Sequence, residues 1–138
     1  MRVITLLVIH CSAVKPDQTS SAAQIDTWHR KDRHYKFGIG YHYVIRRDGS
    51  IEPGRPEWLT GAHCLNHNAH SIGICYEGGL DIRGQPADTR TAEQKTAMRQ
   101  LIADLRQRYP HSPQVFFFKI SDILKKKQYL CRSYNLKT

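Results

Sequence analysis

The 138-residue sequence lacks the features that mark membrane-spanning, secreted or disordered proteins. Its most prominent apolar run, at 4–9, is far too short to cross a bilayer. One basic residue precedes this run and no small-residue cleavage site follows it, so no secretion signal is visible and we expect a cytoplasmic location. No long polar or Gly/Ser tract, internal repeat or linker interrupts the chain, which predicts one globular domain over 1–138.

Acidic residues are few. The 21 Lys and Arg against 12 Asp and Glu give a formal net charge of +9, which favours a polyanionic partner such as nucleic acid, an anionic membrane or a bacterial wall. The basic residues are dispersed, with 125–127 the only tight run, and no known nucleic-acid-binding motif is present. Nucleic acid is therefore the least favoured of these partners, and salt-dependent retention on DNA would test it.

The hydrophobic pattern alternates between strand and helix signals in the order β, α, β, β, β, α, β. Both predicted helices begin with a capping box, Ser21 to Gln24 and Thr91 to Gln94. Asp48-Gly49 is a strong hairpin turn signal. The pattern predicts an α/β domain with a mixed central sheet flanked by helices. The predicted elements are strands at 3–9, 41–47, 50–52, 71–76 and 115–118, and helices at 22–32 and 92–109.

Two residues stand where a strand meets a loop and are candidates for chemistry. His10 ends the first buried strand, where an imidazole faces either a cleft or the core. Tyr41 begins a later strand, where its hydroxyl either donates to a developing oxyanion or caps a core. Three histidines also cluster at His63, His67 and His70, and a zinc site needs about three such ligands. Because His67 and His70 lie in a polar loop, a solvated loop is the default interpretation for them.

Several short motifs occur together and in order. They are VIHCSA at 8–13, Trp28-His29, GYHYVIRRDG at 40–49, Gly61-Ala62-His63 and SIGI at 71–74 followed by Gly78-Gly79. Together they make residues 1–115 resemble the type 2 N-acetylmuramoyl-L-alanine amidases. This family includes small bacteriophage amidase lysozymes and shares its fold with peptidoglycan recognition proteins.

The resemblance implies a reaction and a set of site residues. The family hydrolyses the amide between the lactyl group of N-acetylmuramic acid and L-alanine in peptidoglycan, with a zinc ion held by two histidines and one cysteine. His10 matches the first histidine, Cys131 is the available cysteine, and Tyr41 matches a tyrosine that assists catalysis. Zinc would polarise the scissile carbonyl and activate a water. His63 and Asn68 resemble positions that line the substrate groove.

The segment 116–138 departs from the family pattern. The family places a Gly-His pair, which supplies the second histidine ligand, after the final strand, but this chain reads Val-Phe-Phe-Phe-Lys at 115–119. No histidine follows His111, and Tyr129 stands where the family has an assisting lysine. Two ligands alone hold zinc weakly.

Three explanations of the missing histidine stay open at this point. The chain is a peptidoglycan-binding module that has lost its zinc, or it recruits another ligand such as His29, His42 or His111, or its last stretch comes from a shifted reading frame. The resemblance makes an amidase from a phage or prophage-like source the first hypothesis. It implies a monomer that acts on peptidoglycan after release through a membrane lesion.

Overall fold

The computed structural model describes residues 2–118. Its elements follow the predicted order, and a short 3-10 turn, η1, is added before the fourth strand. Helix α1 and strand β4 have the predicted bounds. The elements are β1 (Leu6–Cys11), α1 (Ala22–Asp32), β2 (Tyr43–Ile45), β3 (Ile51–Pro53), η1 (Asn68–His70), β4 (Ser71–Tyr76), α2 (Ala92–Arg108) and β5 (Gln114–Phe117).

The strands form one five-stranded sheet in the order β3-β2-β4-β1-β5. Strands β2, β4, β1 and β5 are parallel to their neighbours, and β3 pairs antiparallel with β2. The prediction of a mixed central sheet is therefore confirmed. Strand β1 pairs on both sides and all six of its residues are buried, which explains why it is a continuous apolar run in the sequence.

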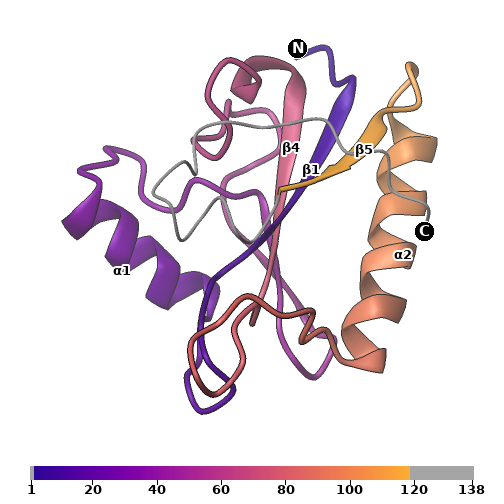
Figure 1. Cartoon of the computed structure of the whole chain (residues 1–138). Coiled ribbons are helices and arrows are strands. Elements are labelled where there is room, and N and C mark those ends of the chain that lie inside the picture. The colour runs from indigo at the N-terminus through magenta and orange to yellow at the C-terminus, as the bar shows by residue number, and fades with distance from the viewer. Residues whose placement is uncertain (1, 119–138) are drawn as a thin grey trace.

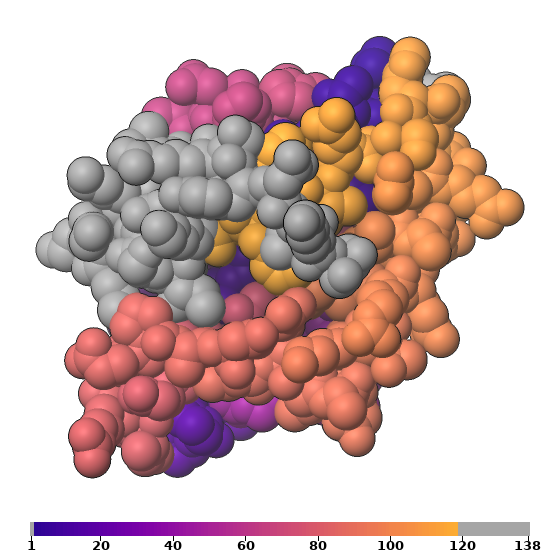
Figure 2. Space-filling model, turned by 45° about the vertical axis from the view of Figure 1, so that its right-hand side comes forward, coloured from indigo at the N-terminus to yellow at the C-terminus, as the bar shows by residue number. Residues whose placement is uncertain are grey.

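The two helices lie on opposite sides of the sheet (Figure 1). Helix α2 contributes Ala97, Met98, Leu101 and Leu105 to a core with Leu7, Ile9, Ile72 and Ile74. A smaller cluster joins Ile25 of α1 to Val44 and Cys75. In the space-filling view, α2 and the segment before it form one continuous surface (Figure 2). Within residues 2–118, no helix is long and apolar enough to span a membrane.

Both predicted capping boxes are formed. Ser21 accepts the backbone N–H of Gln24, and Thr91 accepts that of Gln94. The side chain of Gln94 is fully buried and also donates to the carbonyls of Ile45 and Glu77. The cap of α2 therefore fixes the helix to the ends of β2 and β4 as well as starting it.

The strand bounds differ from the prediction at three places near the site, one of which is β5: it is Gln114–Phe117 and not 115–118, so Phe118 follows the strand. Strand β1 begins at Leu6 and continues through Cys11, so His10 is inside the strand and not its last residue. Strand β2 begins only at Tyr43. Just before it, the carbonyl of Gly40 accepts the N–H of Ala62, so Gly40 bonds to the long loop and not to a strand.

Candidate active site

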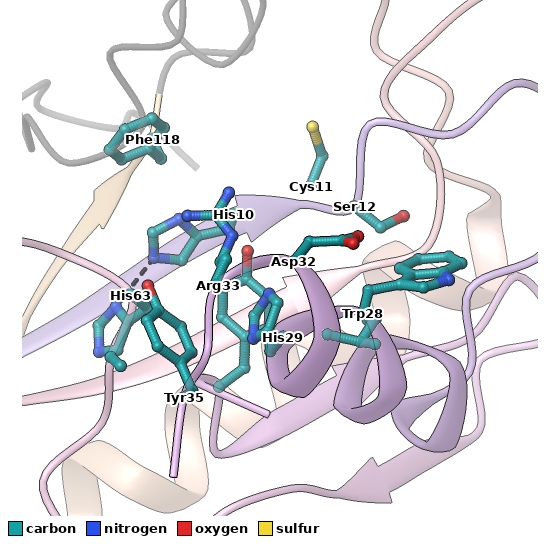
Figure 3. A pocket seen from close by; sticks show the side chains of 13 residues that line it. His10, Cys11, Ser12, Trp28, His29, Asp32, Arg33, Tyr35, His63 and Phe118 are labelled. Atoms are coloured by element: carbon teal, nitrogen blue, oxygen red, sulfur yellow. Dashed lines mark hydrogen bonds between the residues drawn. The ribbon is translucent and has the colours of Figure 1, made fainter. Parts of the chain in front are cut away.

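A pocket of about 280 Å³ lies between the carboxyl end of β1 and helix α1. In open sheets with parallel strands, ligands bind beyond the carboxyl ends of the strands, so this is the expected place for a site. Figure 3 shows that side chains from β1, α1 and the loops converge on it. It is lined by His10, Cys11, Ser12, Ile25, Trp28, His29, Asp32, Arg33, Tyr35, Tyr41, Ala62, His63 and Phe118.

Two buried histidines form the wall of the pocket at β1. His10 and His63 are 3% and 7% exposed, and His10 Nε2 lies 2.9 Å from His63 Nδ1 (Figure 3). His63 Nε2 lies 3.1 Å from the hydroxyl of Ser71. Because His10 Nε2 and His63 Nδ1 share one proton, His10 keeps only Nδ1 for other partners. His10 is thus a core histidine paired with a side chain, and it also lines the cleft, so both sequence interpretations hold in part.

The position of His63 depends on its loop and on β4. The side-chain oxygen of Asn68 accepts the backbone N–H groups of His63 and Cys64, each at 2.9 Å. The ring of His63 then lies against Gly73, where any added Cβ would approach its Cδ2 to 2.5 Å. Asn68 does not line the pocket but supports the loop. Its predicted contact with substrate stays a prediction.

Helix α1 and the segment before β2 form the opposite wall. His29 accepts the N–H of Gly40 at its Nδ1, at 2.9 Å, which ties the helix to the residue before Tyr41. The ring centroid of Tyr41 lies 5.1 Å from that of His10 and 5.5 Å from that of His29. The structure therefore brings together three of the predicted site residues, His10, Tyr41 and His63, which lie far apart in the sequence.

The three histidines of the pocket and Tyr41 are held neutral. Burial lowers the pKa of His10 to about 3 and that of His29 to about 4, and it lowers the pKa of His63 well below the ordinary value. The proximity of His29 lowers the pKa of His10 further, because each imidazole disfavours protonation of the other, and the Arg33 guanidinium lowers the pKa of His29 further. Burial also raises the pKa of Tyr41 well above its ordinary value. At neutral pH the pocket therefore offers imidazole lone pairs and a protonated phenol.

Phe118 closes the pocket from the β5 side. It is 5% exposed and its ring stacks on His10 with centroids 5.0 Å apart and planes at 26° (Figure 3). Its N–H donates to the carbonyl of Ile9 at 2.6 Å, so the pairing of β5 with β1 continues one residue past the strand. The sequence predicts Phe118 as the last residue of the final strand, but it does not show that its ring lies on His10.

The other histidines proposed as substitute ligands differ in their positions. His42 accepts the N–H of Gly73 at Nδ1 and donates from Nε2 to the carbonyl of Leu59, so both of its nitrogens are used. His111 lies at the opposite end of the sheet, where it lines a second cavity of about 490 Å³ with His67 and His70. Only His29 of the three lines the pocket around His10.

Residues 2–118 contain no group of three His, Cys, Asp or Glu side chains placed to hold a metal ion. The neutral His10 suits zinc, but His63 is engaged with it and Phe118 offers no lone pair. The described residues therefore do not fit a zinc ion on their own. Cys131 and Tyr129 lie outside the described residues. Cys11 and Cys75 are buried free thiols.

Comparison with known sequences finds one family and several phage proteins. The family model for N-acetylmuramoyl-L-alanine amidase matches residues 1–136. The endolysin of Escherichia phage T7 is 37% identical over 103 residues, which cover 75% of this chain and 67% of the relative. The endolysin of Enterobacteria phage K11 is 36% identical over 102 residues, 74% of this chain and 66% of the relative. The match spans about two thirds of each endolysin's length.

Solved structures agree with the sequence comparison. The N-acetylmuramoyl-L-alanine amidase LysC from Clostridium intestinale superposes with a TM-score of 0.72 and 29% identity, covering 99% of this chain and 80% of that one. The Drosophila peptidoglycan recognition protein PGRP-LB gives a TM-score of 0.69 at 23% identity, covering 85% and 70%. The second likeness concerns the fold alone.

Proposed function

Because the chain belongs to the N-acetylmuramoyl-L-alanine amidase family, we propose that it hydrolyses the amide between the lactyl group of N-acetylmuramic acid and L-alanine in bacterial peptidoglycan. The observation that carries the proposal is the pocket at the end of β1, where His10, Tyr41 and His63 converge. The endolysin relatives further support a role on the cell wall after release from the cell that made the protein.

Tyr41 has the properties of a hydrogen-bond donor to the reacting carbonyl. Its hydroxyl is protonated at neutral pH, and its ring lines the pocket beside His10. When water adds to the lactyl carbonyl carbon, the carbonyl oxygen becomes negative and a fixed donor stabilises it. The carbon–nitrogen bond then breaks and the nitrogen of L-alanine takes a proton.

The proposal also includes zinc dependence and two metal ligands. The family is generally zinc-dependent, and we assign His10 and Cys131 as the ligands of this chain, with Cys131 outside the described residues. What supports His10 is its neutral, buried imidazole with Nδ1 left over after the bond to His63. When bound, zinc supplies Lewis-acid activation of the carbonyl and of a water.

The enzyme is favoured over a module that only binds peptidoglycan. The family model for N-acetylmuramoyl-L-alanine amidase matches residues 1–136, and phage endolysins match about three quarters of this chain. Both comparisons support an enzyme that cuts peptidoglycan.

Purified peptidoglycan sacculi test the reaction directly. We expect the protein to release new free amino groups without new reducing sugar ends, since only the amide bond is cut. Tyr41→Phe should lower the rate by about 100-fold or more. Tyr35→Phe is the matched control, because it removes a phenol hydroxyl from the same pocket, and it should change the rate only slightly. New reducing ends, or equal losses in the two variants, would refute the assignment.

Metal removal tests whether the amidase activity depends on zinc. After treatment with a chelator the protein should lose amidase activity, and added zinc should restore it. Elemental analysis of the treated protein establishes that the metal is gone. Full activity in protein shown to be free of zinc would refute zinc dependence while leaving the amidase assignment intact.

A further inference from the structure

The strand register places residue 118 beside His10. Strands β1 and β5 are parallel, and Ile9 lies opposite Phe117. The residues that follow these two in the sequence are His10 and Phe118, which therefore also lie side by side. Paired residues of a parallel sheet point to the same face, and here both rings do, stacked with centroids 5.0 Å apart. The N–H of Phe118 bonds to Ile9 and holds the residue in this place.

Position 118 is therefore the neighbour of His10 on the pocket face of the sheet. A histidine there would offer a second imidazole nitrogen beside His10, but phenylalanine has no lone pair to give to a metal ion.

His63 does not replace the missing ligand. Its ring centre is also 5.0 Å from that of His10, but the facing nitrogens are 2.9 Å apart and share a proton. Its other nitrogen faces the hydroxyl of Ser71 at 3.1 Å. A metal shared by the two imidazoles would have to break the hydrogen bond between them.

We propose that Phe118 stands in the place of a metal ligand beside His10, so that the wild-type pocket does not hold zinc tightly, and that a histidine at this one position gives tight binding. The inference rests on the proposed function, because it takes the pocket around His10 as the zinc site of the amidase.

Zinc titration of the full-length protein in competition with a chromophoric chelator tests this. Phe118→His should lower the dissociation constant by at least ~10- to 100-fold, because even residues that only support a metal ligand have effects of that size. Phe118→Leu removes the ring without adding a nitrogen and should not tighten binding. The gain should vanish in the double variant His10→Ala/Phe118→His.

Equal constants for the wild type and Phe118→His, or a gain that survives without His10, would overturn the inference. Circular dichroism establishes that each variant is folded. If Phe118→His does not fold, the wild type decides: loss of zinc during dialysis against a chelator supports the inference, and retention of one zinc per chain overturns it. The peptidoglycan assay separates the two proposals. Tighter zinc binding with no release of amino groups by either protein at saturating zinc would refute the amidase assignment alone.

Discussion

We expect the free energy of unfolding to fall as the pH is lowered from 7 to 5, and His42 to be responsible for a defined share of the loss. His42 is 1% exposed, accepts the N–H of Gly73 at 3.0 Å and donates to the carbonyl of Leu59 at 2.8 Å. Burial, with a smaller effect of Arg2, lowers its pKa to about 4, although the bond to Leu59 acts in the opposite direction. The folded chain therefore holds this histidine neutral.

The sign follows from the two pKa values. In the unfolded chain His42 has a pKa of ~6.5. Between that pH and about 4 the unfolded state binds a proton that the folded state does not, so stability falls as the pH is lowered and the loss ends below about 4. Each pH unit in this window costs ~1.4 kcal/mol, which gives about 2 kcal/mol for His42 between pH 7 and pH 5.

His42→Asn isolates this share. The asparagine oxygen can still accept the N–H of Gly73 but the side chain does not titrate, and the carbonyl of Leu59 loses its donor. The variant should be less stable than the wild type by ~1–3 kcal/mol at pH 7. At pH 5 this deficit should shrink by about 2 kcal/mol, because only the wild type gives up the neutral histidine.

Urea unfolding of both proteins at pH 7 and pH 5 measures the change. His34→Asn is the control, since it makes the same substitution at an exposed histidine whose φ of 56° asparagine tolerates. It should leave the pH dependence as in the wild type. A deficit of His42→Asn that is the same at both pH values would refute the reasoning that His42 is neutral in the folded chain.

Two more substitutions test local packing. Gly73→Ala would place a Cβ 2.5 Å from Cδ2 of His63, so the ring must move and stability should fall by ~1–3 kcal/mol in urea unfolding, with a shift of the His63 ring signals in NMR. An unchanged stability and spectrum would show that the ring does not lie on β4. Ser21→Ala removes the acceptor of the Gln24 N–H and should cost ~1 kcal/mol without changing the amidase rate, because Ser21 is not in the pocket. No loss of stability would contradict the capping box.

The sequence predicts most of the fold because each element has a strong local signal. The bounds of α1 are correct since Ser21 and Gln24 form a capping box at its start, and this signal lies within four residues. Strand β1 is buried on both faces, so its apolar run is continuous. Its predicted start is too early because Val3, although β-branched, is exposed and outside the strand.

The site is only partly predictable from the sequence. His10, Tyr41 and His63 line one pocket, while the roles that the family resemblance implies for them stay predictions. The hydrogen bond between His10 and His63 joins residues 53 positions apart, and no local pattern contains such a pair. No local pattern predicts the position of His29 either, because its hydrogen-bond partner, the N–H of Gly40, lies outside helix α1. Both depend on how helix and loops dock onto the sheet.

The sequence alone does not identify position 118 as the neighbour of His10. The sequence reveals that a histidine is missing after the last strand, but three consecutive phenylalanines, Phe116 to Phe118, leave open which one takes its place. A shift of one residue in the pairing of β5 with β1 would turn each side chain to the other face of the sheet. The observed register, Ile9 opposite Phe117, settles the question and puts Phe118 on the ring of His10. The substitution that should restore tight zinc binding is therefore at 118, and the register predicts that a histidine at 117, where the side chain joins the core under α2, would not do so.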